Sequence, residues 1–168
     1  MGLSIPVGMA EVKASKTADD SLSALGLGSC IGVCVYDPRA RVAGLAHVML
    51  PDSAVIRATD RVVEGKFADT AVPALVQRVE SLGARRADLR AAIAGGAQVF
   101  SFATSSPALA IGSRNAEAVV AALKTAGIPL LAQDCGGTVG RTVTLDVASG
   151  LVRVRVVGGE PVDLYRLG

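Results

Sequence analysis

The sequence predicts a single α/β domain in which antiparallel strands form much of the sheet and helices cover one face. Three observations lead to this prediction. Strand-like segments outnumber helical ones, two helical segments lie between strands, and neither a linker nor an internal repeat divides residues 1–168. A chain of 168 residues is long enough to bury a sizeable core without disulfides or metal ions.

The first half of the chain is predicted to be mainly extended. Residues 1–20 are expected to hold one strand, at about residues 7–12, followed by a mobile turn. Residues 30–36 and 42–50 are rich in small and β-branched side chains and are predicted to be two strands. The segment between them contains Asp-Pro, which favours a turn, so the two strands form a predicted hairpin. A polar loop is expected at residues 52–66.

The second half is predicted to alternate helices and strands. Apolar side chains recur with the 3.6-residue period of a helix at residues 67–82 and again at residues 113–126. Ser113 or Asn115 is the expected N-terminal cap of the second helix. Four further strands are predicted, at residues 89–94, 130–134, 141–147 and 151–157. The last two strands alternate apolar and polar side chains, which is typical of a hairpin.

Composition and charge argue against several classes of function. Only 3% of the residues are aromatic and the net charge is +2 without a Lys or Arg block, so we expect no nucleic-acid partner. The three cysteines, Cys30, Cys34 and Cys135, are odd in number and unevenly spaced, unlike a disulfide framework. Neither a leader nor an apolar stretch of membrane-spanning length stands out, so a cytoplasmic protein without membrane insertion is expected.

Cys30 and His47 are the residues most suited to chemistry. His47 is the only histidine, and Cys30 follows a flexible Gly-Leu-Gly-Ser segment. A hairpin centred near residues 38–40 pairs positions that sum to about 77–79, and 30 plus 47 is 77, so strand pairing would bring the two together. An imidazole beside a thiol favours the nucleophilic thiolate. The residues alone leave another interpretation open, in which both are core residues, because free cysteine is often buried.

A metal site fits these residues less well. A zinc site would need Cys30, Cys34, His47 and Cys135, but two residues four apart on a strand are separated by about 13 Å. Zinc holds sulfur at about 2.3 Å, so only a looped or helical arrangement would bring Cys30 and Cys34 to one ion. A complete glycine-rich phosphate-binding motif is also lacking. We therefore expect neither a metal nor a cofactor.

A series of motifs resembles one protein family. The motifs are Leu25-Gly26-Leu27-Gly28-Ser29-Cys30, Tyr36-Asp37-Pro38, Ala46-His47-Val48-Met49-Leu50-Pro51, Lys66-Phe67-Ala68-Asp69-Thr70-Ala71, Ile93-Ala94-Gly95-Gly96-Ala97, Ile111-Gly112-Ser113-Arg114-Asn115 and Asp134-Cys135-Gly136-Gly137. In this order they resemble the CheD family, the chemoreceptor glutamine deamidases of bacterial and archaeal chemotaxis. The resemblance extends from about residue 26 to residue 159.

The resemblance implies a fold, an activity and partners. The implied fold is a three-layer α/β/β sandwich with largely antiparallel or mixed sheets and helices on one face. The implied activity is hydrolysis of the side-chain amides of particular receptor glutamines to glutamate, and some members also cleave glutamyl methyl esters. The implied partners are methyl-accepting chemoreceptors and a chemotaxis phosphatase of the CheC type. The alternative is a weakly active or inactive binding module that regulates such a phosphatase.

The resemblance also assigns residues and reveals one departure. The family cysteine corresponds to Cys30 and the family histidine before Met-Leu-Pro to His47, which implies a Cys-His thioester mechanism. The family threonine six positions before the cysteine is Ala24 in this chain. Ser23 is the adjacent candidate for an orienting or auxiliary role, although neighbouring residues of a strand point to opposite faces.

Four further residues are expected around the reacting groups. Backbone N–H groups of the segment that holds Gly28 and Ser29 are expected to stabilise an oxyanion. The loop at Gly95 and Gly96 is expected to line the substrate groove, because glycine allows a close backbone approach. The implied substrate is a helix of another protein, so this groove should be open.

Overall fold

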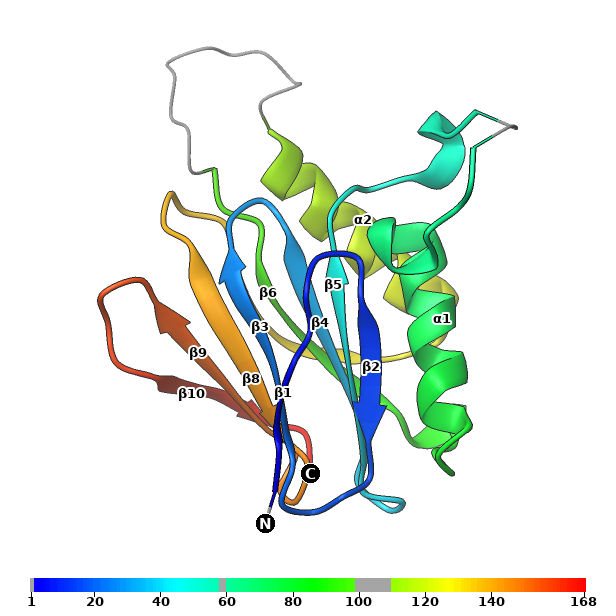
Figure 1. Cartoon of the computed structure of the whole chain (residues 1–168), viewed down its shortest axis with the longest axis vertical. Helices are drawn as coiled ribbons and strands as arrows, with labels where there is room; N and C mark the ends of the chain where they lie inside the picture. Colours follow the sequence, from blue (N-terminus) through cyan, green and yellow to red (C-terminus); the bar gives the residue numbers. More distant parts are fainter. Residues whose placement is uncertain (1, 58–59, 99–109) are drawn as a thin grey trace.

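The computed structural model describes residues 2–57, 60–98 and 110–168 and has a mixed α/β fold with two five-stranded sheets (Figure 1). In spatial order, the first sheet contains β1 (Ser4–Pro6), β3 (Ser21–Leu27), β8 (Arg141–Asp146), β9 (Leu151–Val156) and β10 (Val162–Arg166). The second sheet contains β2 (Val12–Ser15), β5 (Val42–Val48), β4 (Ile31–Asp37), β6 (Arg90–Gly95) and β7 (Leu130–Cys135). The two helices are α1 (Ala68–Glu80) and α2 (Ile111–Thr125). The predicted α/β class is confirmed.

Most neighbouring strands are antiparallel, as predicted. Only the β1–β3 and β6–β7 pairs of the described strands are parallel. The predicted hairpin is formed by β4 and β5, which pair from Ile31 opposite Val48 to Asp37 opposite Val42. The carboxylate of Asp37 accepts hydrogen bonds from the backbone N–H groups of Arg39 and Ala40 at 2.9 and 3.1 Å, which closes the turn.

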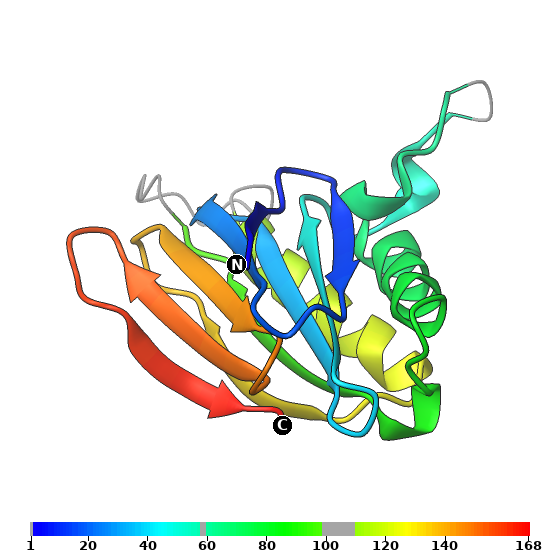
Figure 2. The same ribbon diagram turned by 60° about the horizontal axis from the view of Figure 1, so that its bottom comes forward.

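The central strands of the second sheet, β5, β4 and β6, are buried on both faces. Along β4, Val33 and Val35 pack with residues of α1 and α2, whereas Cys34 and Tyr36 pack with residues of the first sheet. This division follows from the alternation of side chains along a strand. Figures 1 and 2 show both helices on the face of the second sheet that lies away from the first sheet. Neither described helix is long and apolar enough to cross a membrane.

The N-terminal region differs from the prediction. Residues 7–11 do not form a strand but connect β1 of the first sheet to β2 of the second sheet. Ala10 has a φ of 65°, which interrupts an extended conformation. Strands β1, β3 and β10 were not predicted. Serine, alanine and glycine weaken the strand signal of β3, and Pro161 and several glycines flank β10.

Other boundaries shift by one or two residues. Helix α2 begins at Ile111, and Ala110 precedes it without a side-chain cap, so neither Ser113 nor Asn115 is its cap. Cys30 lies directly before β4 instead of inside a strand. The predicted polar loop at residues 52–66 contains two short 3₁₀ turns, and its residues 58 and 59 lie outside the described residues.

Candidate active site

Cys30 lies where the chain passes from the first sheet to the second. Leu27 ends β3, and β4 begins at Ile31, so the glycine-rich segment spans the gap between the sheets. Cys30 precedes Gly32 by two positions, on the side of β4 that faces the first sheet, and it packs against the core between the sheets. Burial raises the pKa of the Cys30 thiol.

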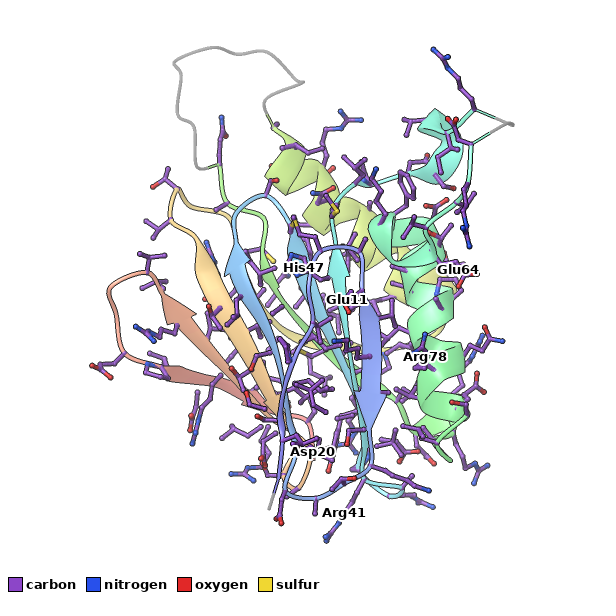
Figure 3. The ribbon with its side chains drawn as sticks, in the orientation of Figure 1. Glu11, Asp20, Arg41, His47, Glu64 and Arg78 are labelled. Atoms are coloured by element: carbon purple, nitrogen blue, oxygen red, sulfur yellow. The ribbon has the colours of Figure 1, made fainter. Side chains whose placement is uncertain are left out.

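His47 projects into the same space from β5. It lies opposite Gly32 in the β4–β5 pairing, so Cys30 and His47 are diagonal neighbours, for which a Cα separation of roughly 7–8 Å is typical. His47 is 3% exposed. Figure 3 shows His47 near the end of β5, beside the segment that joins β1 to β2.

The two ring nitrogens of His47 have different surroundings. Nδ1 lies 3.0 Å from the carbonyl oxygen of Val7. A carbonyl oxygen accepts only, so Nδ1–H is the donor and the neutral ring keeps its lone pair on Nε2. Nε2 is buried and has no hydrogen-bond partner among the described residues. The imidazole is therefore oriented at one nitrogen and available as a base at the other.

The main chain of residues 7–11 holds the imidazole in place. The N–H of Val7 donates to the carbonyl of Ser23 at 2.7 Å, which ties this segment to β3. Two further bonds tie it to His47 itself, from Ala10 N–H to the His47 carbonyl at 2.9 Å and from His47 N–H to the Glu11 carbonyl at 3.0 Å. The segment therefore fixes both the backbone and the ring of His47.

One pocket joins the two predicted catalytic residues. Its volume is about 350 Å³, and its lining residues are Pro6, Val7, Gly8, Met9, Ser23, Leu25, Gly26, Cys30 and His47. Met9 and Leu25 are 65% and 62% exposed and form an apolar rim. Within the described residues there is no hydrogen bond between the Cys30 thiol and the His47 ring.

The loop before β4 has its carbonyls bound and two of its N–H groups unbound. The Gly28 and Cys30 carbonyls accept from Ala97 N–H at 2.8 Å and Gly96 N–H at 2.9 Å. The Ser29 carbonyl accepts from Asn115 Nδ2 at 2.9 Å. The N–H groups of Ser29 and Cys30 donate to no acceptor in the described parts of the chain. Because N–H and C=O of one trans peptide point in opposite directions, these two donors point away from the groups that bind the carbonyls.

Gly95 and Gly96 pack against the main chain of this loop and are not among the pocket-lining residues. Gly95 has a φ of 119°, and a Cβ there would lie 2.1 Å from the Cys30 carbonyl oxygen. Gly96 has a φ of 67°. Both glycines therefore let the main chain of β6 approach that of Cys30.

Ser23 and Ala24 have separate environments. Ser23 lines the pocket, but its hydroxyl oxygen lies 3.2 Å from that of Thr144. Ala24 is fully buried between the sheets. The hydrogen bond that orients the imidazole is accepted by the Val7 carbonyl instead of a side chain. Every residue carries such a main-chain group, so the sequence gives no signal for it.

The other cysteines differ from Cys30. Cys34 is fully buried, and desolvation raises its pKa to about 12. Cys135 is half-buried, and desolvation raises its pKa to about 11. Among the residues that the structure describes, no three His, Cys, Asp or Glu side chains are grouped so that they could hold a metal ion.

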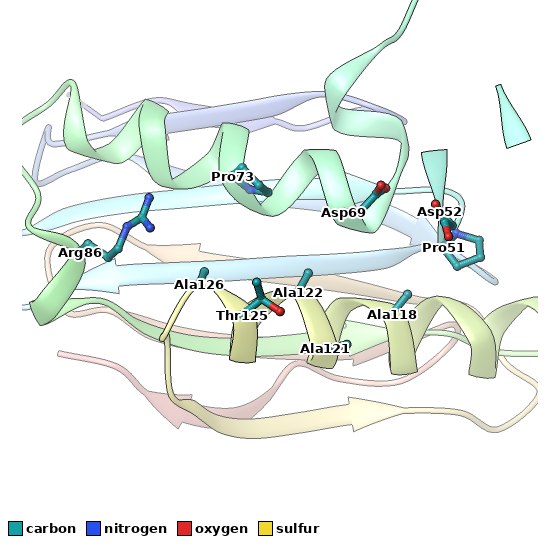
Figure 4. Close-up of a pocket in the computed structure, with 10 residues that line it drawn as sticks. All are labelled: Pro51, Asp52, Asp69, Pro73, Arg86, Ala118, Ala121, Ala122, Thr125 and Ala126. Carbon is teal, nitrogen blue, oxygen red and sulfur yellow. The ribbon is translucent and has the colours of Figure 1, made fainter. Parts of the chain in front are cut away.

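A second pocket of about 440 Å³ lies between α1 and α2 (Figure 4). Its lining residues are Pro51, Asp52, Asp69, Pro73, Arg86, Ala118, Ala121, Ala122, Thr125 and Ala126. The Asp69 carboxylate accepts hydrogen bonds from the backbone N–H and the hydroxyl of Ser53, at 3.0 and 2.6 Å. The lining contains neither cysteine nor histidine, so the chemistry proposed for Cys30 and His47 belongs to the other pocket.

Comparison with known proteins identifies the family. The family profile described as CheD chemotactic sensory transduction matches residues 49–156. A protein of Desulfitobacterium hafniense (strain DSM 10664 / DCB-2), named "Probable chemoreceptor glutamine deamidase CheD", is 49% identical over 159 residues, which cover 94% of this chain and 97% of the relative.

Two further relatives carry the same name. The protein of Lachnoclostridium phytofermentans is 46% identical, with 94% of this chain and 96% of the relative covered. The protein of Clostridium botulinum (strain Hall) is 45% identical, with 92% and 93% covered. Because the family profile matches residues 49–156, more than half of the chain, and relatives this similar align along nearly all of it, the protein belongs to the CheD family.

Proposed function

We propose that this protein is a chemoreceptor glutamine deamidase, in which Cys30 is the nucleophile and His47 transfers protons. The observation that carries the proposal is the shared pocket, where the buried Nε2 of His47 has no described partner and Nδ1–H is held by the Val7 carbonyl. Relatives named as probable chemoreceptor glutamine deamidases support the substrate class. The order of helices, second sheet and first sheet supports the three-layer α/β/β sandwich that the resemblance implies.

The first step forms a thioester. Because burial raises the pKa of Cys30, the resting sulfur is a thiol at neutral pH. Nε2 of His47 takes the thiol proton as the sulfur attacks the amide carbon of a receptor glutamine. The amide oxygen becomes an oxyanion, which the N–H groups of Ser29 and Cys30 stabilise. His47 then gives its proton to the departing nitrogen, the C–N bond breaks, and ammonia leaves.

The second step restores the enzyme. Water attacks the thioester while His47 accepts a proton from it, the C–S bond breaks, and the sulfur recovers its proton. The product is a glutamate side chain. The same steps on a glutamyl methyl ester would release methanol instead of ammonia.

The Val7 carbonyl takes the orienting role in this proposal. In cysteine and serine hydrolases, the third group orients the imidazole and favours one tautomer without itself exchanging protons with the substrate. A main-chain carbonyl fulfils that role independently of the side chain at position 24, so Ala24 is compatible with activity. Ser23 contributes through its carbonyl, which accepts the Val7 N–H.

Ammonia release from a purified cytoplasmic receptor fragment tests the proposal. Cys30→Ala should abolish release because the nucleophile is gone, and His47→Gln should lower kcat by about 100- to 10,000-fold. Cys34→Ala is the matched control, since Cys34 faces the same inter-sheet core but lines no described pocket with His47. Release by Cys30→Ala at the wild-type rate would refute the mechanism.

A binding module that regulates a CheC-type phosphatase is the second candidate. It is favoured by Ala24 in place of the family threonine and by the missing hydrogen bond between the thiol and the imidazole. Binding to a purified CheC-type phosphatase, measured beside ammonia release, separates the candidates. Tight binding by a wild-type protein that releases no ammonia would favour the module.

A further inference from the structure

Asn115 connects the two segments that carry Cys30 and His47. It is fully buried on α2, and its Nδ2 donates to the carbonyl of Ser29 and to the carbonyl of Met49, both at 2.9 Å. Ser29 directly precedes Cys30, and Met49 follows His47 by two residues. Because both neighbours of Nδ2 are carbonyl oxygens, only the amide NH₂ group can form these bonds.

The bond to Ser29 orients the next N–H group. The Ser29 carbonyl and the Cys30 N–H belong to one planar peptide unit and point in opposite directions. With the carbonyl held by Asn115, the Cys30 N–H is turned away from α2 and has no acceptor among the described residues. This N–H is one of the two oxyanion donors in the proposed reaction.

We infer that Asn115 is a positioning residue of the deamidase: its amide fixes the Ser29–Cys30 peptide so that the Cys30 N–H faces the oxyanion. The inference rests on the proposed function. Asn115 touches neither the thiol nor the imidazole in the described contacts, so it acts through the main chain.

Asn115 does not serve to stabilise its own helix. Asn115 is not the cap of α2 and bonds to two other segments instead of its own helix. Its Oδ1 is buried without a partner in the described chain, which lowers stability. The close approach of α2 to the Gly96 backbone requires a residue without a side chain, because a Cβ at Gly112 would lie 2.4 Å from the Gly96 carbonyl oxygen. Glycine at position 112 therefore lets α2 reach the loop that supports Cys30.

The test compares two reactions of Cys30. Amide hydrolysis develops an oxyanion, whereas alkylation by iodoacetamide displaces iodide by direct attack of sulfur on carbon and develops none. For Asn115→Ala and Asn115→Leu, kcat for ammonia release should fall by about 10- to 100-fold. KM and the Cys30 alkylation rate at pH 8 should change by less than about threefold, because the thiol and the imidazole are not touched.

The variants are chosen to separate positioning from folding. Asn115→Leu has the same branching at Cγ, donates no hydrogen bond and buries no charge beside the two carbonyl oxygens, so it decides the question if Asn115→Ala does not fold. Val119→Ala is the control, because Val119 lies one turn further along α2 and is equally buried but bonds to neither carbonyl. Its kcat should stay at the wild-type value.

The possible outcomes distinguish the positioning role of Asn115 from the proposed deamidase function. Wild-type kcat in both Asn115 variants would overturn the positioning role and leave the deamidase intact. A parallel loss of kcat and alkylation would also overturn it, since the thiol itself would have moved. A wild-type protein without ammonia release removes the proposed function and this inference with it. Asn115 is the only asparagine, so selective ¹⁵N labelling shows a single side-chain NH₂ group, whose two protons should exchange slowly with solvent; fast exchange of both would overturn the inference.

Discussion

At the residue scale, Cys30 differs from the other two cysteines in what surrounds the sulfur. Cys30 lines a pocket beside Nε2 of His47, which has no hydrogen-bond partner in the part of the chain that the structure describes. Cys34 is sealed between the sheets, and Cys135 is half-buried at the end of β7. Since only the thiolate reacts, access and pKa together decide which sulfur is modified.

Iodoacetamide should modify Cys30 faster than Cys135, and Cys135 faster than Cys34. The pKa values of Cys135 and Cys34 are raised to about 11 and about 12, and that of Cys30 is also raised by burial. Raised values mean that the thiol form dominates at pH 8, so the Cys30 rate should climb about tenfold per pH unit and level off only above the ordinary thiol value of about 8.5. Peptide mass spectrometry over a pH series measures each rate. A Cys30 rate already level at pH 7 would instead indicate a preformed thiolate–imidazolium pair.

At the element scale, the proposed active site depends on three strand ends and one connection between the sheets. The end of β3, the start of β4 and the end of β6 meet at the Cys30 loop, where Gly95 and Gly96 approach its main chain. Residues 7–11 cross from the first sheet to the second and bind His47 on the way. The carbonyls of Gly28, Ser29 and Cys30 thereby each have a partner, which restrains the loop.

Gly95→Ala should lower both stability and kcat, whereas Gly83→Ala should lower stability alone. Both glycines have positive φ, at 119° and 105°, so alanine costs about 1 kcal/mol of conformational free energy at either position. Only at Gly95 would the new Cβ displace the Cys30 carbonyl, because nothing lies within 4 Å of the Cβ position at Gly83. Urea unfolding and ammonia release measure the two effects. Equal kcat in both variants would show that the Cys30 loop tolerates the displacement.

At the scale of the whole molecule, the proposed site opens at one edge of the space between the two sheets. The helices lie on the other side of the second sheet, so they do not cover it (Figures 1 and 2). The rim carries the exposed apolar side chains Met9 and Leu25. An apolar rim around a reactive pocket suits a protein substrate that buries the rim on binding.

Met9→Ser and Leu25→Ser should raise KM for a receptor fragment by about three- to tenfold with little change in kcat, because rim contacts bind the substrate without touching the reacting atoms. Leu3→Ser is the matched control, since Leu3 is 66% exposed but does not line the pocket. Steady-state ammonia release gives both constants. An unchanged KM in both rim variants would place the substrate elsewhere on the surface.

Local sequence patterns determined the parts of this fold that are stabilised by neighbours in the chain. The β4–β5 hairpin follows from two apolar runs around Asp-Pro, and α1 and α2 follow from their 3.6-residue periods. The same hairpin placed Cys30 and His47 near each other, and the structure puts both in one pocket. Their catalytic roles stay predictions, as does that of Ser23.

Contacts between distant segments were decided only by the tertiary structure. Strand β3 forms by pairing with β8, far along the chain, and its own composition gives little strand signal. The Val7 carbonyl that binds His47 and the carbonyls that bind Asn115 are main-chain groups, which every residue carries. The sequence by itself determines where apolar and polar side chains alternate. The packing of the two sheets decides which backbone groups form hydrogen bonds with each other. Those hydrogen bonds orient the imidazole of His47 and the Cys30 loop.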